Sequence, residues 1–313
     1  MTSKKSLAKV LTDEQITSRL AEANEKLFHY KYRSDSLWKR LDSLQDTYPQ
    51  PDDIEFIKYI DTEAILYYRE LQDCGVSFPA WQDMITVGGE TDLRLFLHIG
   101  RNCYEDIIKY LPKNKEVLRV LDFGVGCGRT ARHFYQTMSE YEVHGCDVDE
   151  TPIDFIYKNI PFIQPLLSTN EPPLPYKSNY FDAIYSVSVF SHLNESAFYA
   201  WAEELSRIMK PGGILVITIH GLHALNITRN KTDVGTIGID KKEFDSTESL
   251  VTEKGFIWMP QETTSQDIDI SQYGISFIDK NRLAAHLPPS LKIIHYGEGE
   301  IGGWQDLVVL EKT

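Results

Sequence analysis

One short segment of the sequence brings together residues whose types and spacing suit ligand binding or catalysis. It contains one acid and three glycines, namely Asp122, Gly124, Gly126 and Gly128, in the order Asp-x-Gly-x-Gly-x-Gly. Glycines let a backbone turn tightly and pass close to a ligand, where a Cβ atom would collide. A second acid, Asp147, stands at the end of the next apolar run, where a carboxylate could accept hydrogen bonds from ribose hydroxyls. The pattern predicts a site for a nucleotide-containing ligand.

Two strands and a helix must position these residues. Apolar residues at 117–121 predict a strand that ends at the glycine cluster. Residues 129–138 predict the following helix, whose first N–H groups would point back at the ligand. Residues 143–146 predict a second strand that ends at Asp147. This is the first half of a nucleotide-binding α/β unit.

The glycine spacing bears on which nucleotide is bound. The dinucleotide motif is Gly-x-Gly-x-x-Gly, and its second glycine admits a pyrophosphate. Here an acid precedes the first glycine by two positions. A carboxylate there suits a cationic group, such as the ammonium of a methionine moiety, and suits a pyrophosphate badly. The spacing therefore disfavours a nicotinamide-dependent oxidoreductase.

With this spacing, the segment resembles the class I S-adenosylmethionine-dependent methyltransferases. Two later segments, Tyr180-Phe-Asp and Arg207-Ile-Met-Lys-Pro-Gly-Gly-Ile-Leu-Val-Ile-Thr-Ile219, follow in the family's order, so the resemblance covers about 117–220. It implies S-adenosylmethionine as cofactor, with its methionine end at the glycine turn and its ribose at Asp147. It also implies a Rossmann-like, doubly wound α/β fold with a seven-stranded, mostly parallel sheet and an antiparallel last strand.

Three further residues are cofactor-binding candidates. Asn170 stands where the family usually has an adenine-binding acid, so an amide would make that contact here. Ser186 is near the end of the strand predicted at 181–187, on the side where open α/β sheets bind ligands. Arg101, with Arg94 as the weaker option, could pair with the methionine carboxylate, because arginine forks match carboxylates. A surface arginine is the alternative for Arg101.

Histidines are the candidates for catalysis. Methyl transfer to an oxygen benefits from a base, and a histidine with a near-neutral pKa can take a hydroxyl proton. His220 directly follows the strand predicted at 214–219, and His192 follows the strand at 181–187. The alternative for each is a histidine that is hydrogen-bonded within the framework. No histidine or acid cluster has metal-ligand spacing, so no metal is predicted.

The resemblance leaves two parts of the chain unexplained. Residues 1–100 are expected to form a helical N-terminal extension or cap on a methyltransferase domain at 101–313. The extension packs on the main domain or a second subunit, or forms a lid, and a homodimer is possible. Within the domain, the polar, irregular stretch 222–276 is an insertion too long for a simple connector. We expect it to recognise the substrate, with Trp258, Gln261 and Tyr273 shaping the pocket.

Composition limits the partners. The formal net charge of −14 would repel phosphate backbones, so nucleic acid is not expected as a partner. No apolar run has the length of a signal peptide or a membrane span, so no membrane association is expected. The four cysteines show no Cys-x-x-Cys spacing, which favours a reduced, cytoplasmic protein.

The sequence thus predicts an S-adenosylmethionine-dependent methyltransferase that acts on a small-molecule acceptor. A hydroxyl of a metabolite or natural-product intermediate is favoured because of the histidines. A cofactor-binding partner subunit without catalysis and a protein methyltransferase remain as alternatives.

Overall fold

A computed structural model describes residues 71, 75–79, 93–113, 116–230, 244–261, 265 and 267–313 of the chain. The helices expected between residues 1 and 70 lie outside this part. The expected boundary at residue 100 falls inside helix α5 (Leu93–Ile108). No helix in the described ranges is long and apolar enough to cross a membrane.

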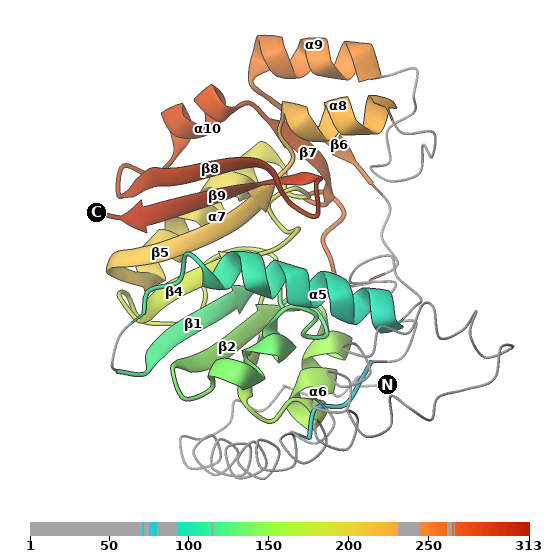
Figure 1. The fold of residues 1–313 in the computed structure, drawn as a ribbon. Helices are drawn as coiled ribbons and strands as arrows, with labels where there is room; N and C mark the ends of the chain where they lie inside the picture. Colours follow the sequence, from blue (N-terminus) through green and yellow to red (C-terminus); the bar gives the residue numbers. More distant parts are fainter. Residues whose placement is uncertain are drawn as a thin grey trace, which may run out of the picture.

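A seven-stranded sheet forms the centre of the molecule (Figure 1). Its strands are β1 (Leu118–Phe123), β2 (Tyr141–Asp147), β3 (Ile163–Leu167), β4 (Phe181–Ser186), β5 (Met209–Ile219), β8 (Leu291–Ile301) and β9 (Gln305–Lys312). Their order across the sheet is β3-β2-β1-β4-β5-β9-β8. The first five strands pair in parallel, whereas β9 is antiparallel to both β5 and β8. The predicted fold is therefore confirmed.

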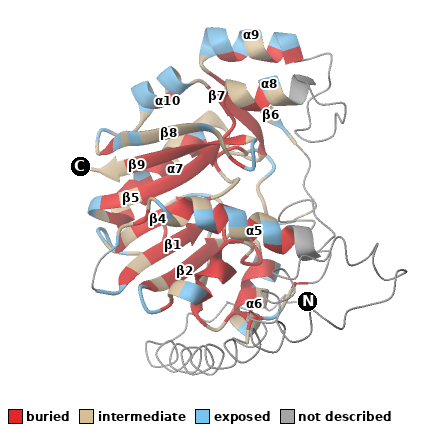
Figure 2. Cartoon of the chain, in the orientation of Figure 1, coloured by how far each residue is buried: buried red, intermediate tan, exposed pale blue. Residues whose placement is uncertain are grey.

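Helices cover both faces of the sheet, as in a doubly wound fold. Helix α5, the 3₁₀ helix η1 (Ala131–Thr137) and α6 (Glu150–Asn159) bury apolar side chains in one core. Helix α7 (Glu195–Ile208) and α10 (Lys280–His286) pack into a second core on the other face. Figure 2 shows the strands buried between these layers. The helix predicted at 129–138 is thus present as a shorter, tighter 3₁₀ helix.

The segment after β5 has its own structure. It contains α8 (Leu222–Asn230), α9 (Phe244–Lys254) and a two-stranded antiparallel sheet of β6 (Phe256–Pro260) and β7 (Gly274–Ile278). A small separate core joins these elements; it includes Leu225, Phe244, Val251 and Phe277. Strand β7 extends two residues beyond the expected end of the insertion at 276. The insertion stands beside the end of β5 (Figure 1).

Strand β5 begins earlier than its apolar run predicts. The sequence predicts this strand at 214–219, after the Lys-Pro-Gly-Gly segment. Instead Met209 already pairs with Phe181 of β4, and a bulge takes up the extra residues before regular pairing resumes. Gly212 allows this with a φ of +74°, a value that favours glycine.

One buried arginine joins the chain before α5 to the glycine turn. Arg132 is completely buried, and its guanidinium donates to three carbonyl oxygens, those of Cys127, Gly128 and Ser77, at 2.8, 2.9 and 3.3 Å. The guanidinium also lies 5.1 Å from the centre of the Phe96 ring. Burial lowers its pKa to about 10, so it remains charged at neutral pH.

Candidate functional site

A pocket opens at the carboxyl ends of β1, β2 and β4, where open α/β sheets bind ligands. Its lining includes residues of the glycine turn, the ends of these strands, the loop after β4 and the insertion. The main members are Asp122, Gly124, Gly126, Arg129, Asp147, Asp149, Asn170, Ser188, His192, Trp201, Asp269 and Tyr273. Segments far apart in the sequence therefore form one site.

The glycine turn is held tightly between β1 and β2. The N–H of Gly124 donates to the Cys146 carbonyl at 2.9 Å. The φ angles of Gly124, Gly126 and Gly128 are +83°, +51° and +78°, all in the left-handed region. A Cβ on Gly124 would stand 2.1 Å from Val189 Cγ2. Gly128 is not among the lining residues; a Cβ there would meet Ile160, so helix packing is what requires this glycine.

Asp122 brings a buried carboxyl group to the pocket. Its exposed fraction is 3%, and Tyr185 of β4 donates a 2.8 Å hydrogen bond from its hydroxyl to Asp122 Oδ2. Burial raises the pKa of Asp122 to about 8, and the nearby Asp147 carboxylate adds to the shift. A cation at this point would stabilise the ionised form, because an opposite charge favours it. The carboxyl group therefore fits an ammonium or sulfonium ligand.

Asp147 stabilises the turn and also faces the pocket. Its Oδ2 accepts from Gly126 N at 2.7 Å, and its Oδ1 accepts from Asp149 N at 3.1 Å. Burial raises the pKa of this carboxyl group above its usual range. Because an ionised carboxylate has about four acceptor positions, each oxygen can still accept a ribose hydroxyl.

The arginine in the pocket differs from the one expected. Arg101 lies on α5, where its Nε donates to Glu105 Oε1 at 2.8 Å, and it is not a lining residue. Arg129, one residue after the glycine turn, lines the pocket instead and lowers the pKa of Asp122 through its charge. Its position directly after Gly128 was the available signal.

Asn170 lines the pocket, but its amide is bonded to the insertion. Nδ2 donates to the Asp267 carbonyl at 2.8 Å, and Oδ1 accepts from Asp269 N at 2.9 Å. Glu150 N, at the start of α6, donates to Asp267 Oδ2 at 3.1 Å. The segment 267–273 is thereby fixed across one end of the pocket.

Ser186 does not reach the pocket. It is fully buried, and its hydroxyl donates to the Phe123 carbonyl at 2.8 Å, which joins β4 to β1. Ser188, two residues further along, does line the pocket and has a φ of +59°. This left-handed conformation is uncommon for serine and had no sequence signal.

His192 is the expected histidine that faces the pocket. Its Nδ1 lies 2.7 Å from the Gly274 carbonyl oxygen, which can only accept, so Nδ1 carries the proton. The ring stacks on Tyr273, with centroids 5.0 Å apart and planes 10° apart. Burial lowers the pKa of His192, so the ring is neutral at pH 7. Its Nε2 makes no hydrogen bond within the described ranges and is not among their buried, unpartnered atoms.

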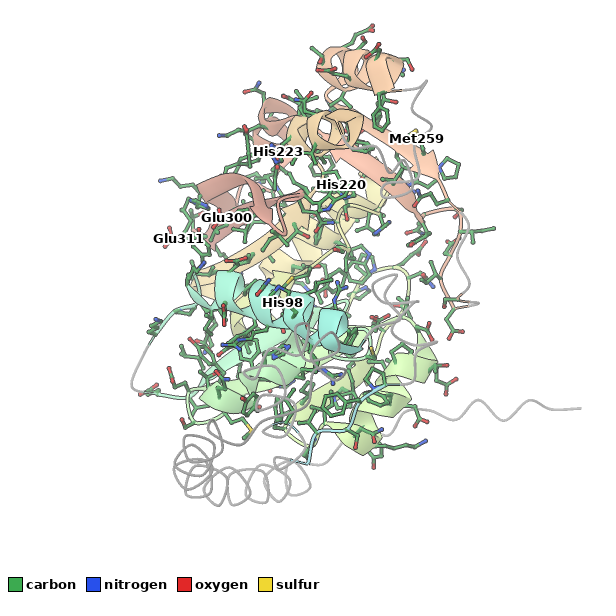
Figure 3. All side chains as sticks on the ribbon, turned by 45° about the vertical axis from the view of Figure 1, so that its right-hand side comes forward. His98, His220, His223, Met259, Glu300 and Glu311 are labelled. Carbon is green, nitrogen blue, oxygen red and sulfur yellow. The ribbon has the colours of Figure 1, made fainter. Side chains whose placement is uncertain are left out.

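His220 lies behind the pocket and is not a lining residue. Only 6% of it is exposed, its Nε2 lies 3.3 Å from Gln305 Nε2, and Phe277 of β7 packs near its ring. Burial lowers its pKa to about 3. His223 lies in α8, and its ring faces Gly299 of the β8–β9 hairpin; both histidines are labelled in Figure 3. The framework interpretation thus fits His220 better than the catalytic one.

The insertion provides part of the pocket wall. Ile268, Asp269, Gln272 and Tyr273 all line it. Trp258 and Gln261 do not, but Trp258 Nε1 donates to the His192 carbonyl at 3.2 Å and so supports the histidine loop. No group of three or more histidine, cysteine, aspartate or glutamate side chains in the described ranges could hold a metal ion.

An open, mostly parallel sheet with a glycine turn after one strand and an acid at the tip of the next defines a nucleotide-binding α/β protein. Residues 120–213 match a family described as a methyltransferase domain. The chain therefore contains a class I S-adenosylmethionine-dependent methyltransferase domain, and this family implies S-adenosylmethionine as cofactor. The acid at the tip of β1 and the carboxylate at the tip of β2 fit that cofactor.

Two curated relatives are distant. A tRNA N(3)-cytidine methyltransferase, METTL2, of Gallus gallus is 25% identical over 140 residues, which is 42% of this chain and 37% of the relative. The corresponding Bos taurus protein is 25% identical over 130 residues, covering 38% and 34%. The chain thus spans little more than a third of the length of either relative.

The fold also occurs in solved structures. The PH0226 protein from Pyrococcus horikoshii OT3 superposes with a TM-score of 0.50 at 15% identity, covering 79% of this chain and 98% of that one. At this identity the similarity shows the fold alone.

Proposed function

We propose that the protein transfers a methyl group from S-adenosylmethionine to a hydroxyl of a small-molecule acceptor, with His192 as the general base. The observation that carries this proposal is the fixed tautomer of His192 in the same pocket as Asp122 and Asp147. When bound, S-adenosylmethionine supplies a methyl group on a sulfonium that an acceptor oxygen can attack in line.

The proposed roles divide between two parts of the pocket. Asp122 balances the positive charge of the cofactor, and Asp147 accepts from the ribose while it holds the Gly126 N–H. Arg129 is the proposed partner of the methionine carboxylate, because it is the guanidinium that lines the pocket. Asn170 would fix the insertion over the adenosine end, so its role is more structural than the sequence suggested.

His192 is suited to take a proton. Since Nδ1–H is committed to the Gly274 carbonyl, the remaining nitrogen, Nε2, carries a lone pair. The lowered pKa keeps the ring neutral, and a neutral imidazole is the form that accepts a proton from a hydroxyl. A general base of this kind contributes about 10²–10⁴-fold to a rate.

The pocket's charge supports a small molecule over nucleic acid. Among the residues that the structure describes, its lining carries four carboxyl groups, Asp122, Asp147, Asp149 and Asp269, against one guanidinium, Arg129. Such a surface repels phosphates, and the net charge of −14 acts in the same direction. The tRNA methyltransferases among the relatives make a nucleoside acceptor the second candidate. A tritium-transfer assay with total tRNA alongside small hydroxyl compounds separates the two.

The test of the base is His192→Gln, which keeps a polar side chain of similar length. We expect the transfer rate to fall about 10²–10⁴-fold while binding of S-adenosylhomocysteine is unchanged. Full activity in this variant would refute the role of His192. Cofactor binding without transfer to any acceptor by the wild type would instead favour a non-catalytic partner subunit. Transfer to proteins but not to small molecules would favour a protein methyltransferase.

A further inference from the structure

The loop after β4 carries two pocket-lining residues, Ser188 and His192, whose hydrogen-bonding roles are both fixed. Ser188 stands at the carboxyl end of β4 with a φ of +59°, and its N–H donates to Thr218 Oγ1 at 2.8 Å. A non-glycine residue in the left-handed region is strained and persists only where its surroundings impose it. The surrounding contacts therefore hold this hydroxyl in one position.

Gln305, at the start of β9, determines which way the Ser188 hydroxyl points. The Ser188 Oγ–H donates to Gln305 Oε1 at 3.1 Å. The amide nitrogen of Gln305 is engaged on its other side, 3.3 Å from Ser191 Oγ and 3.3 Å from His220 Nε2. The structure places the amide oxygen toward Ser188, so the proton of Ser188 points to Gln305, which does not line the pocket. This network gives His220 and Gln305, both buried, a structural reason to be polar.

Ser188 Oγ and His192 Nε2 are therefore two hydrogen-bond acceptors that cannot donate to a ligand. Ser188 Oγ can offer the pocket only lone pairs, and His192 Nε2 likewise offers only a lone pair, because Nδ1 holds the proton. The two residues lie four positions apart in one loop, which a hydrogen bond from His192 N to the Val189 carbonyl at 2.8 Å closes into a turn. A ligand that hydrogen-bonds to both acceptors must supply one donor hydrogen to each.

We propose that the acceptor substrate carries two adjacent donor groups, as in a vicinal diol, a catechol or an amino alcohol, and that Ser188 selects for the second donor. This inference rests on the proposed function. One hydroxyl gives its proton to His192 Nε2 as its oxygen forms the new C–O bond and the sulfonium keeps the electrons of the broken C–S bond. The neighbouring donor binds Ser188 Oγ and fixes the orientation of the substrate. Gln305 is a positioning residue that acts through Ser188.

The test uses ligand-observed NMR titration of the protein saturated with S-adenosylhomocysteine. The probes are two matched pairs: catechol with 2-methoxyphenol, and trans-1,2-cyclohexanediol with 2-methoxycyclohexanol. Within each pair a methyl group replaces the second donor hydrogen. Leaving buried acceptors unmatched by a donor weakens binding, so we expect the diol of at least one pair to bind about tenfold tighter than its ether.

Two variants distinguish substrate selection by Ser188 from a general change in protein packing. Ser188→Ala removes the acceptor, so the preference for the diol should disappear while S-adenosylhomocysteine binding stays unchanged. Gln305→Leu frees the Ser188 proton to point into the pocket, so binding of the ether should improve relative to wild type, a change that mere loosening of the fold would not produce.

The inference is overturned if diol and ether bind equally in both pairs, or if none of the four probes binds the S-adenosylhomocysteine complex. Either result leaves the cofactor assignment intact. Failure of the wild type to bind S-adenosylhomocysteine at all would instead reject the proposed function itself.

Discussion

Binding of the cofactor should depend steeply on pH through Asp122. In the free protein burial raises the pKa of Asp122 to about 8, so the carboxyl group is mostly protonated at neutral pH. A bound ammonium or sulfonium stabilises the ionised form, and binding must then release a proton. The affinity for the cofactor should therefore rise with pH until the pH exceeds the pKa of Asp122 in the free protein.

The size of this effect can be worked out from the pKa. With a pKa near 8 in the free protein and a carboxyl group that is fully ionised in the complex, the Kd for S-adenosylhomocysteine should fall about 80-fold between pH 5.5 and 7.5. The ligand's own amino group, with an α-amino pKa of about 7.7–8.0, is still mostly protonated at pH 7.5, so its titration reduces this change by less than about twofold. Asp122→Asn, which cannot ionise, should show a nearly flat Kd and bind more weakly than wild type at pH 7.5.

Isothermal titration calorimetry in two buffers of different ionisation enthalpy measures both the Kd and the number of protons released on binding. At pH 6.5 the wild type should release close to one proton per ligand bound, and Asp122→Asn should release almost none. Tyr185→Phe is the matched control, because the Tyr185 hydroxyl donates to Asp122 and lowers its pKa. Its loss should move the pH dependence to higher pH. A wild-type Kd that does not change from pH 5.5 to 7.5 would refute the reasoning.

Three further predictions concern the glycine turn, the buried arginine and the insertion. Gly124→Ala should abolish cofactor binding and lower the free energy of unfolding by about 2–4 kcal/mol, because its Cβ would stand 2.1 Å from Val189. Gly212→Ala is the control: this glycine has a similar φ but open space around its Cβ, so the change should cost only about 1 kcal/mol. Chemical denaturation measures both free energies. Arg132→Ala removes a completely buried guanidinium and its hydrogen bonds to the Cys127, Gly128 and Ser77 carbonyls, so it should cost about 3 kcal/mol by the same measurement. An unchanged midpoint would contradict this. Asn170→Asp replaces the amide donor by a carboxylate that faces the Asp267 carbonyl, so backbone hydrogen exchange at 267–273 should be faster at pH 7. Equal exchange in both proteins would show that the Asn170 hydrogen bonds do not hold this segment.

The parts of the site that could be predicted are those that follow from local pattern. The glycine spacing and the two acids at strand tips determine a turn and its charge wherever the rest of the chain packs, so Asp122, Gly124, Gly126 and Asp147 are where the sequence places them. The α/β class likewise follows from the strand-helix-strand pattern at 117–147, and the resemblance implied the seven-stranded, mostly parallel sheet. The resemblance added the antiparallel strand at the end.

The remaining residues depend on packing, which no local pattern encodes. Arg101 is bonded to Glu105 along α5 and does not line the pocket, an orientation that depends on how α5 packs. His220 and His192 both follow strands, but β7 of the insertion covers the first and supports the second. The left-handed conformation of Ser188 arises from contacts with β5 and β9, which come later in the chain.

The measurement that tests the central claim most directly is calorimetric titration of S-adenosylhomocysteine into wild type, Asp147→Ala and Asp154→Ala. Asp154 is a suitable control because it is an exposed acid on α6 that does not line the pocket. We expect one binding site in the wild type and in Asp154→Ala. Asp147→Ala should lose binding, because Asp147 both holds the glycine turn and is the proposed ribose acceptor. Equal binding by Asp147→Ala and wild type would contradict the proposed cofactor site. No binding to wild-type protein shown by mass spectrometry to be free of cofactor would contradict the proposed activity.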